Sequence, residues 1–193
     1  MPILPVRSTA LVLFAMACLT PASARATCLP TNPDLSVHGI ELGDPLSAAL
    51  QIGDVELAED ENGQAYAVLT NADETEVLKL YRTFGDTSGA YQEAELLTTD
   101  ELENDEDATV LETAQFRTGR GVRLSMGRQE VFDLFGTCAP VEQGDDGTEV
   151  VRYEVSDIAT SDLLKSHNMP LYRAEYVFKQ GKLVHLLFGF SYP

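Results

Sequence analysis

Histidines, cysteines and carboxylates are the residues of this sequence that could do chemistry, and their spacing forms no recognisable active site. His38, His167 and His185 lie far apart, and no two of them have the spacing of a zinc site on a helix. Patterns such as GxSxG, HExxH and the glycine-rich phosphate loops do not occur. The run Ser166-His167-Asn168 precedes Pro170, and we interpret it as a loop, because sequence neighbours seldom form a nucleophile–base pair. We therefore expect no enzyme, no cofactor and no metal. A glycosidase-type carboxylate pair is the alternative that the residues leave open.

The densest carboxylates lie at residues 100–107, in the run Asp-Glu-Leu-Glu-Asn-Asp-Glu-Asp. Closely spaced carboxylates can supply oxygen ligands to a divalent cation or attract a basic partner. An EF-hand loop would need a central glycine, which this run lacks. We interpret the run mainly as a solvated linker or an exposed helix start, and we retain Asp100, Glu101, Glu103 and Asp105 as candidate binding residues.

The N-terminal segment has the features of a secretory signal peptide. Arg7 supplies a positive charge, Ser8 to Thr20 is an apolar core too short for a membrane span, and Ala24-Arg25-Ala26 is an A-x-A cleavage signal. We expect cleavage after Ala26 and a periplasmic or secreted protein.

Charge and cysteine content limit the partners of the cleaved chain. Cleavage removes two arginines and no acidic residue, so 11 basic and 31 acidic residues remain, with a net charge of −20. Nucleic acid and anionic lipid would repel such a chain. Cleavage also removes Cys18 and leaves Cys28 and Cys138 in an oxidising compartment. We expect Cys28 and Cys138 to form a disulfide, and two free or partner-linked thiols are the alternative.

The sequence contains two copies of a strand-turn-helix pattern, and we expect the elements of this pattern to position the candidate residues. Its first copy has strand-like alternation from Val37 to Leu42 and a turn at Gly43-Asp44-Pro45. Pro45 suits the first position of the helix that Leu46, Ala49 and Leu50 indicate by their spacing. The second copy turns at residues 125–127 and continues as a helix to Phe135, which Gly136 ends.

Strand-like runs separated by turn residues follow each helix. They lie at residues 65–70, 76–84 and 89–97 in the first copy, and at 148–155, 172–179 and 182–190 in the second. Gln180-Gly181 is a hairpin turn between the last two runs. The pattern predicts an α+β fold of two tandem small modules. Each would have a turn-helix opening followed by an antiparallel β-meander, with the helices packed on one side of the sheet.

The expected organisation runs from the N-terminus to the C-terminus in five parts. These are a signal peptide at residues 1–26, an N-terminal tail at 27–36, a first α+β module at 37–97, an acidic linker at 98–118 and a second α+β module at 119–193.

The phrase G-(I/V)-x-L-G-x-(S/P)-x-x-x-(V/A), the short helix closing at glycine and the following meander resemble the BamE (SmpA/OmlA) family of outer-membrane assembly lipoproteins. Two such modules in tandem resemble the architecture of the β-lactamase inhibitor protein. The resemblance covers Val37 to Phe190, and it implies a curved antiparallel sheet, no cofactor and protein–protein binding. A lipid-bearing cysteine just after the signal peptide is missing, so no stable membrane insertion is expected after cleavage.

Alternation along the strands predicts which side chains face the core and which face solvent. In the second module the inward set is Ala174, Tyr176, Phe178, Val184, Leu186, Phe188 and Phe190, and the outward set is Arg173, Glu175, Val177, Lys179, His185 and Leu187. In the first module we expect Phe84 to be buried, and Tyr81 and Tyr91 to face outward. Tyr81 and Tyr91 are candidate anchors for a partner, because tyrosine buries a large area at a low entropic cost.

These features together predict a periplasmic or secreted, non-enzymatic protein-binding protein of the BamE-like or β-lactamase-inhibitor-like kind. The acidity favours a basic protein partner and disfavours nucleic acid. Two alternatives are an inhibitor or immunity protein against a basic hydrolase or toxin, and an uncharacterised hydrolase of the cell envelope.

Overall fold

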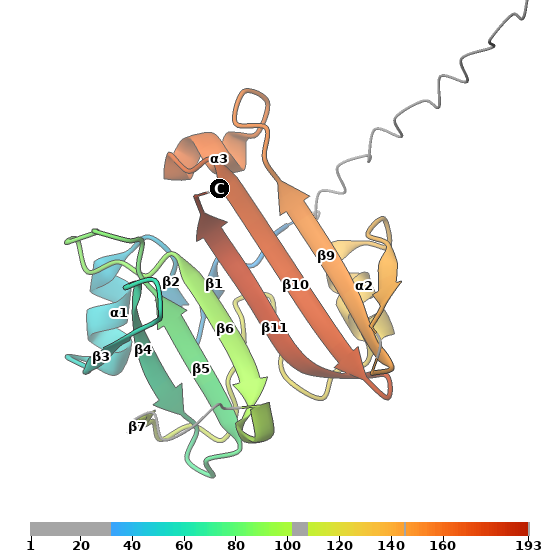
Figure 1. Cartoon of the computed structure of the whole chain (residues 1–193), viewed down its shortest axis with the longest axis horizontal. Helices are drawn as coiled ribbons and strands as arrows, with labels where there is room; N and C mark the ends of the chain where they lie inside the picture. The colour runs from blue at the N-terminus through green and yellow to red at the C-terminus, as the bar shows by residue number, and fades with distance from the viewer. Residues whose placement is uncertain (1–31, 102–107, 145, 193) are drawn as a thin grey trace, which may run out of the picture.

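The structure, a computed structural model, describes residues 32–101, 108–144 and 146–192 (Figure 1). Strands dominate the described chain, which also contains three short α-helices and one 3-10 helix. The first half contains β1 (Ser36–Val37), β2 (Ile40–Glu41), α1 (Pro45–Ile52), β3 (Leu57–Glu59), β4 (Ala65–Thr70), β5 (Glu76–Tyr81), β6 (Glu93–Thr98), η1 (Thr99–Glu101) and β7 (Thr109–Val110). The second half contains α2 (Arg128–Phe135), β8 (Val141–Gln143), β9 (Thr148–Val155), α3 (Asp162–His167), β10 (Leu171–Lys179) and β11 (Lys182–Ser191).

One sheet of nine strands joins the two halves of the chain (Figure 1). Its order is β3-β4-β5-β6-β11-β10-β9-β8, with every neighbouring pair antiparallel, and β7 adds to β4 in parallel. The halves meet where β6 pairs with β11, from His185 opposite Leu97 to Gly189 opposite Glu93. The edges of the sheet are formed by strands of only two or three residues, which limits pairing with other chains.

The predicted fold class, α+β with two tandem modules, is therefore wrong. The chain is mostly β, and its two meanders form one continuous sheet. The α-helices have only eight, eight and six residues. Two separate meanders would each leave an edge strand with unpaired N–H and C=O groups, and the pairing of β6 with β11 satisfies those groups within the chain.

Local signals explain where the helices begin and end. Asp44 Oδ1 accepts a hydrogen bond from the Leu46 N–H at 2.9 Å and caps α1, which begins at Pro45 as predicted. The Gly136 N–H donates to the Phe132 carbonyl at 2.8 Å and ends α2, also as predicted. Among the described residues, no helix is long and apolar enough to cross a membrane.

The β10–β11 hairpin shows the expected turn and one irregularity. Gln180 and Gly181 both have positive φ, 52° and 75°, so the predicted hairpin turn is confirmed. A register shift between Val177 and Phe178 places Leu183 opposite Phe178. Leu183, which is 1% exposed, therefore joins the core in place of the predicted Val184, because the extra residue of a bulge changes the alternation.

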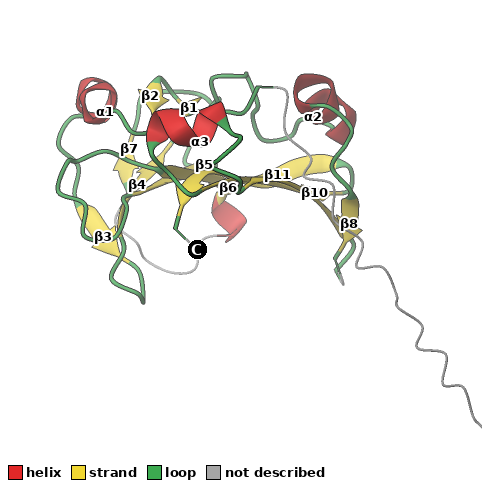
Figure 2. Ribbon diagram, turned by 90° about the horizontal axis from the view of Figure 1, so that it is seen from above, coloured by secondary structure: helices red, strands yellow, loops and turns green. Residues whose placement is uncertain are grey.

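One side of the sheet is covered by α1, α2, α3, the β1–β2 hairpin and loops (Figure 2). The main core lies between the sheet and these segments, and both halves contribute to its apolar cluster. Val37, Leu80, Phe135, Tyr176 and Phe188 are among its buried members. A smaller cluster of Tyr66, Val68, Val77 and Leu97 lies on the other side of the sheet, within the first half. The continuous core links the two meanders as firmly as the strand pairing does.

Residues 98–118, predicted to be an acidic linker, contain ordered elements within their described part. They include η1 and β7, and β7 pairs with β4. Phe116 is fully buried, and its N–H donates to Glu76 Oε2 at 2.7 Å. The segment therefore contributes to the sheet and to the core.

Candidate binding surface

The side of the sheet opposite the helices carries the outward side chains of five strands, and we call this surface the open face (Figure 2). Residues two apart on a strand share a face, so the pairing register defines its cross-strand rows. The rows are Tyr81–Glu93–Gly189–Arg173, Lys79–Glu95–Leu187–Glu175–Arg152 and Leu97–His185–Val177–Val150.

Tyr81, Glu95 and His185 form a hydrogen-bonded chain across β5, β6 and β11. The Tyr81 hydroxyl donates to Glu95 Oε2 at 2.5 Å, and His185 Nε2 lies 2.9 Å from Glu95 Oε1. Burial acts to raise the pKa of Glu95, but the hydrogen bonds from His185 and Tyr81 outweigh it and leave the pKa lowered. Burial and the bond to Glu95 raise the pKa of Tyr81. At neutral pH an ionised Glu95 thus accepts from a protonated Tyr81, which orders this part of the open face.

A second polar network orders the β8–β9–β10 end of the open face. Arg152 Nε lies 2.6 Å from Glu175 Oε2, and Arg152 Nη1 also bonds to the Glu142 carboxylate. Exposed ion pairs of this kind add little to stability. They do restrict the rotamers of long side chains, which lowers the entropic cost of binding a partner.

Apolar side chains occupy the middle of the open face. Leu187 is half-buried, and its cross-strand neighbours are Glu95 and Glu175. Val177 and Val150, in the adjacent row, are also half-buried. An apolar centre surrounded by polar groups with fixed positions is the anatomy of a protein-binding surface.

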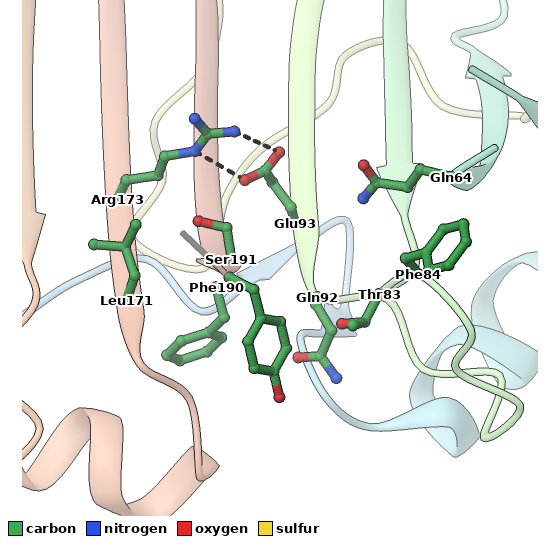
Figure 3. Close-up of a pocket in the computed structure, with 10 residues that line it drawn as sticks. Gln64, Thr83, Phe84, Gln92, Glu93, Leu171, Arg173, Phe190 and Ser191 are labelled. Carbon is green, nitrogen blue, oxygen red and sulfur yellow. Dashed lines mark hydrogen bonds and ion pairs between the residues drawn. The ribbon is translucent and has the colours of Figure 1, made fainter. Parts of the chain in front are cut away.

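At one end of the open face the surface forms a groove of ≈ 680 Å³, which we call the junction groove (Figure 3). Arg173 and Glu93 line it and form a two-pronged ion pair, with Nε–Oε2 at 3.0 Å and Nη2–Oε1 at 3.1 Å. Gly189 stands between them in the row and carries no side chain. A Cβ there would lie 2.3 Å from the Gln92 carbonyl oxygen, so glycine is what allows β6 and β11 to approach.

Two aromatic side chains that line the junction groove are largely exposed, Phe84 by 75% and Tyr192 by 60%. The prediction that Phe84 is buried is wrong, because β5 ends at Tyr81 and Phe84 lies in the connection that follows. Phe190 also lines the groove, but it is 2% exposed and its ring stacks on the His167 ring at 4.4 Å between centroids. Sequence reasoning missed this groove, because the pairing of β6 with β11 creates it.

The two tyrosine candidates have different positions. Tyr81 lies on the open face with its side chain partly buried. The prediction that Tyr91 faces outward is wrong: Tyr91 is 3% exposed and belongs to the core, with the Arg82 guanidinium 5.2 Å from its ring centroid. The reason is that β6 begins only at Glu93, so the strand alternation does not extend to residue 91.

The acidic and cysteine candidates are only partly described. Asp100 is exposed on η1, which lies on the open-face side of the sheet, and Glu101 ends η1 (Figure 2). The other two acidic candidates, Glu103 and Asp105, lie outside the described residues. Cys138 is disulfide-bonded, and its expected partner Cys28 also lies outside the described residues, so this pairing stays a prediction.

Histidines and metal-ligating groups do not gather into a site in the described chain. Across residues 32–101, 108–144 and 146–192, no group of three His, Cys, Asp or Glu side chains is arranged to hold a metal ion. Ser166 and His167 lie at the end of α3 and not in a loop as predicted. Ser166 Oγ donates to the Leu163 carbonyl at 2.9 Å, and His167 Nδ1 lies 3.0 Å from the same carbonyl oxygen. Both side chains therefore contact the backbone of their own helix.

No known protein family matches this chain, and no curated protein matches it. Among solved structures, the chain is similar to the crystal structure of an extracellular protein containing an SCP domain from Bacillus anthracis str. Ames. The two chains are 10% identical with a TM-score of 0.39, and the similarity covers 79% of this chain and 44% of that chain. This chain thus spans less than half the length of that protein. The resemblance to BamE and to the β-lactamase inhibitor protein stays a prediction.

Proposed function

We propose that this chain is an exported, non-enzymatic protein-binding protein that contacts its partner through the open face. The observation that carries the proposal is Leu187, a half-buried apolar side chain at the centre of a sheet surface from which α1, α2 and α3 are absent. The surrounding side chains are already ordered by the Tyr81–Glu95–His185 and Arg152–Glu175 contacts. Such a surface needs little rearrangement before it binds.

Charge supports a basic partner. The cleaved chain carries a net charge of −20, which would accelerate encounters with a positively charged surface and slow them as salt is added. Asp100, which is exposed on η1, is one described acidic residue that could contribute to this steering. Specificity would come from the apolar centre, because exposed charges alone give weak, salt-sensitive contacts.

Export supports the same proposal. Residues 1–26 have the composition of a signal peptide with a cleavage signal ending at Ala26. We expect the exported protein to begin at Thr27, which N-terminal sequencing would test. Retention of Met1 in the exported protein would contradict export by cleavage.

The binding proposal is tested by isolating the partner with the exported protein as bait, identifying it by mass spectrometry, and then measuring its affinity for variants. Leu187→Arg should weaken binding about thirtyfold or more, because a buried anchor contributes about 2 kcal/mol or more. Ile158→Arg is the matched control: Ile158 is 43% exposed and lies outside the open face, so this change should leave the affinity unchanged.

Association and dissociation rates distinguish the role of the acidic residues from that of Leu187. Asp100→Lys together with Glu101→Lys should slow association and flatten its salt dependence, whereas Leu187→Arg should mainly speed dissociation. If every variant binds like the parent across a salt series, the open face is not the binding surface. If the partner is a hydrolase whose rate falls when this protein is added, the inhibitor form of the proposal holds.

A further inference from the structure

We infer that the junction groove is a second binding site, and that it takes a neutral saccharide. It lies at the end of the open face and is lined by residues from β10, β11, the start of β6 and the connections beside them (Figure 3). Its volume of ≈ 680 Å³ is within the range of sites that hold small ligands. The inference is independent of the protein partner proposed above.

The charge of the groove favours an uncharged ligand. Arg173 and Glu93 neutralise each other through two hydrogen bonds, and Glu93 is only 7% exposed. Because the pair is already neutral, the groove offers a charged ligand no unpaired counter-charge from Arg173 or Glu93 to offset the cost of removing that ligand's charge from water. A neutral ligand can leave the pair intact and still accept a hydrogen bond from the outer edge of the Arg173 guanidinium.

The exposed aromatic rings favour a ligand with apolar faces and a polar rim. Phe84 and Tyr192 together leave large ring areas in water beside a polar groove, and exposed apolar surface of this kind commonly marks a binding site. A sugar ring presents C–H groups on its faces and hydroxyls around its edge. The faces of the sugar can therefore pack against the aromatic rings while its hydroxyls form hydrogen bonds with the polar groups of the groove.

The polar groups of the groove match hydroxyls. Within the described chain, the side chains of Thr83, Gln92 and Ser191 make no hydrogen bond, so their donors and acceptors are available. The Gln64 amide nitrogen donates to the Arg82 carbonyl at 2.9 Å, which leaves its oxygen to accept. A hydroxyl both donates and accepts, as do these neutral hydroxyl and amide groups taken together.

The backbone disfavours a peptide as the occupant. An extended peptide commonly binds by adding a strand to an exposed sheet edge. Here the adjacent backbones are paired with each other: Gly189 is opposite Glu93, and the Phe190 N–H donates to the Gln92 carbonyl at 2.8 Å. The groove therefore offers side chains and aromatic rings, and no row of free backbone groups between β6 and β11.

The test is a titration of the ¹⁵N-labelled protein, followed by NMR, with three uncharged probes: maltotriose, cellotriose and fully N-acetylated chitotriose. At least one probe should produce saturable shifts at the amides of Phe84, Gln92 and Ser191. Phe84→Ala and Tyr192→Ala should each weaken that binding about tenfold, whereas Ile158→Ala, which changes an exposed apolar residue elsewhere, should not. The affinity should stay constant between low and high salt, because the ligand carries no charge.

Several outcomes would overturn the inference. They are the absence of shifts with all three saccharides, or equal binding by the parent and Phe84→Ala. A parallel titration with the peptide Ala-Phe-Ala would also overturn it if that peptide alone produced shifts. Leu187→Arg separates the two proposals: it should leave saccharide binding unchanged while it weakens binding of the protein partner about thirtyfold or more.

Discussion

Among single residues, Asp34 is notable because its carboxyl group is buried in the interior, between the two halves of the chain. It is 1% exposed; Oδ1 accepts a hydrogen bond from the Arg120 N–H at 2.8 Å, and its backbone carbonyl accepts one from the Tyr172 hydroxyl at 2.9 Å. Burial raises the pKa of Asp34 to about 6, although the contacts with Thr118 and Arg120 favour the charged form. Asp34 thus helps to join the N-terminal hairpin to β10, and its ionised form is unfavourable in the fold.

The pH dependence of stability follows from this raised pKa. The folded chain holds the Asp34 proton up to about pH 6, whereas the unfolded chain releases it near 3.8, so the contribution is complete below about pH 4 and is lost as the pH rises through 6. Two pKa units correspond to about 3 kcal/mol. We expect the free energy of unfolding of Asp34→Asn, measured with urea, to rise by about that much relative to the parent's as the pH increases from 4 to 8. The exposed Asp73→Asn is the control, and parallel pH curves for parent and Asp34→Asn would contradict the prediction.

At the scale of elements, the pairing of β6 with β11 depends on Gly189. Its φ is 148°, and an added Cβ would lie 2.3 Å from the Gln92 carbonyl oxygen and 2.5 Å from Glu93 Cα. Both contacts are with backbone, which cannot rotate away. A side chain at residue 189 would therefore push apart the two strands that join the halves of the sheet, and would disturb the Arg173–Glu93 pair.

We expect Gly189→Ala to lower the free energy of unfolding by about 3 kcal/mol, since backbone strain and a core displacement combine. Gly181→Ala is the matched control. Gly181 also has positive φ, 75°, but no atom lies within 4 Å of its added Cβ, so its loss should be only about 1 kcal/mol. Equal losses for the two variants in urea unfolding would show that the close approach of the strands is unimportant.

Considering the entire chain, one sheet and a shared main core make the two halves interdependent. Strands β3 to β6 and β8 to β11 share the cluster that includes Val37, Phe116 and Phe188. The first half also has a smaller apolar cluster of its own, formed by Tyr66, Val68, Val77 and Leu97, but most buried apolar side chains belong to the shared cluster. We therefore interpret the described chain as a single cooperative unit, and a disulfide from Cys138 toward the N-terminus would act on the whole unit.

The disulfide prediction is tested by comparing single and double variants. If Cys28 and Cys138 are bonded, they close a loop of about 110 residues, and chain entropy predicts a stabilisation of about 4–5 kcal/mol. Cys28→Ser, Cys138→Ser and the double variant should then all lose the same amount in urea unfolding, because each removes the same bond. Peptide mapping without reductant should recover the linked pair. Additive losses, or two free thiols in the map, would contradict the pairing.

The features that could be predicted from the sequence are those whose causes lie within a few residues. The Asp44-Pro45 start of α1, the Gly136 end of α2 and the Gln180-Gly181 turn all follow from caps and from φ values that few residues tolerate. The strand alternation also assigned Arg173, Glu175, Val177, His185 and Leu187 to one face, where the structure places them. These signals act locally, so they are visible before any fold is known.

How the strands assemble, and which side chains that assembly exposes, depends on contacts between residues far apart in the sequence. The pairing of β6 with β11 joins residues some ninety positions apart, and no local signal distinguishes it from two separate meanders. Because of this pairing the chain forms one sheet, where two tandem modules were predicted. The pairing also brings Glu93, Gly189 and Arg173 into the row beside the junction groove. Tyr91 and Phe84 were misplaced for a related reason: each lies just beyond a strand end, where alternation no longer applies and long-range packing sets the direction of the side chain.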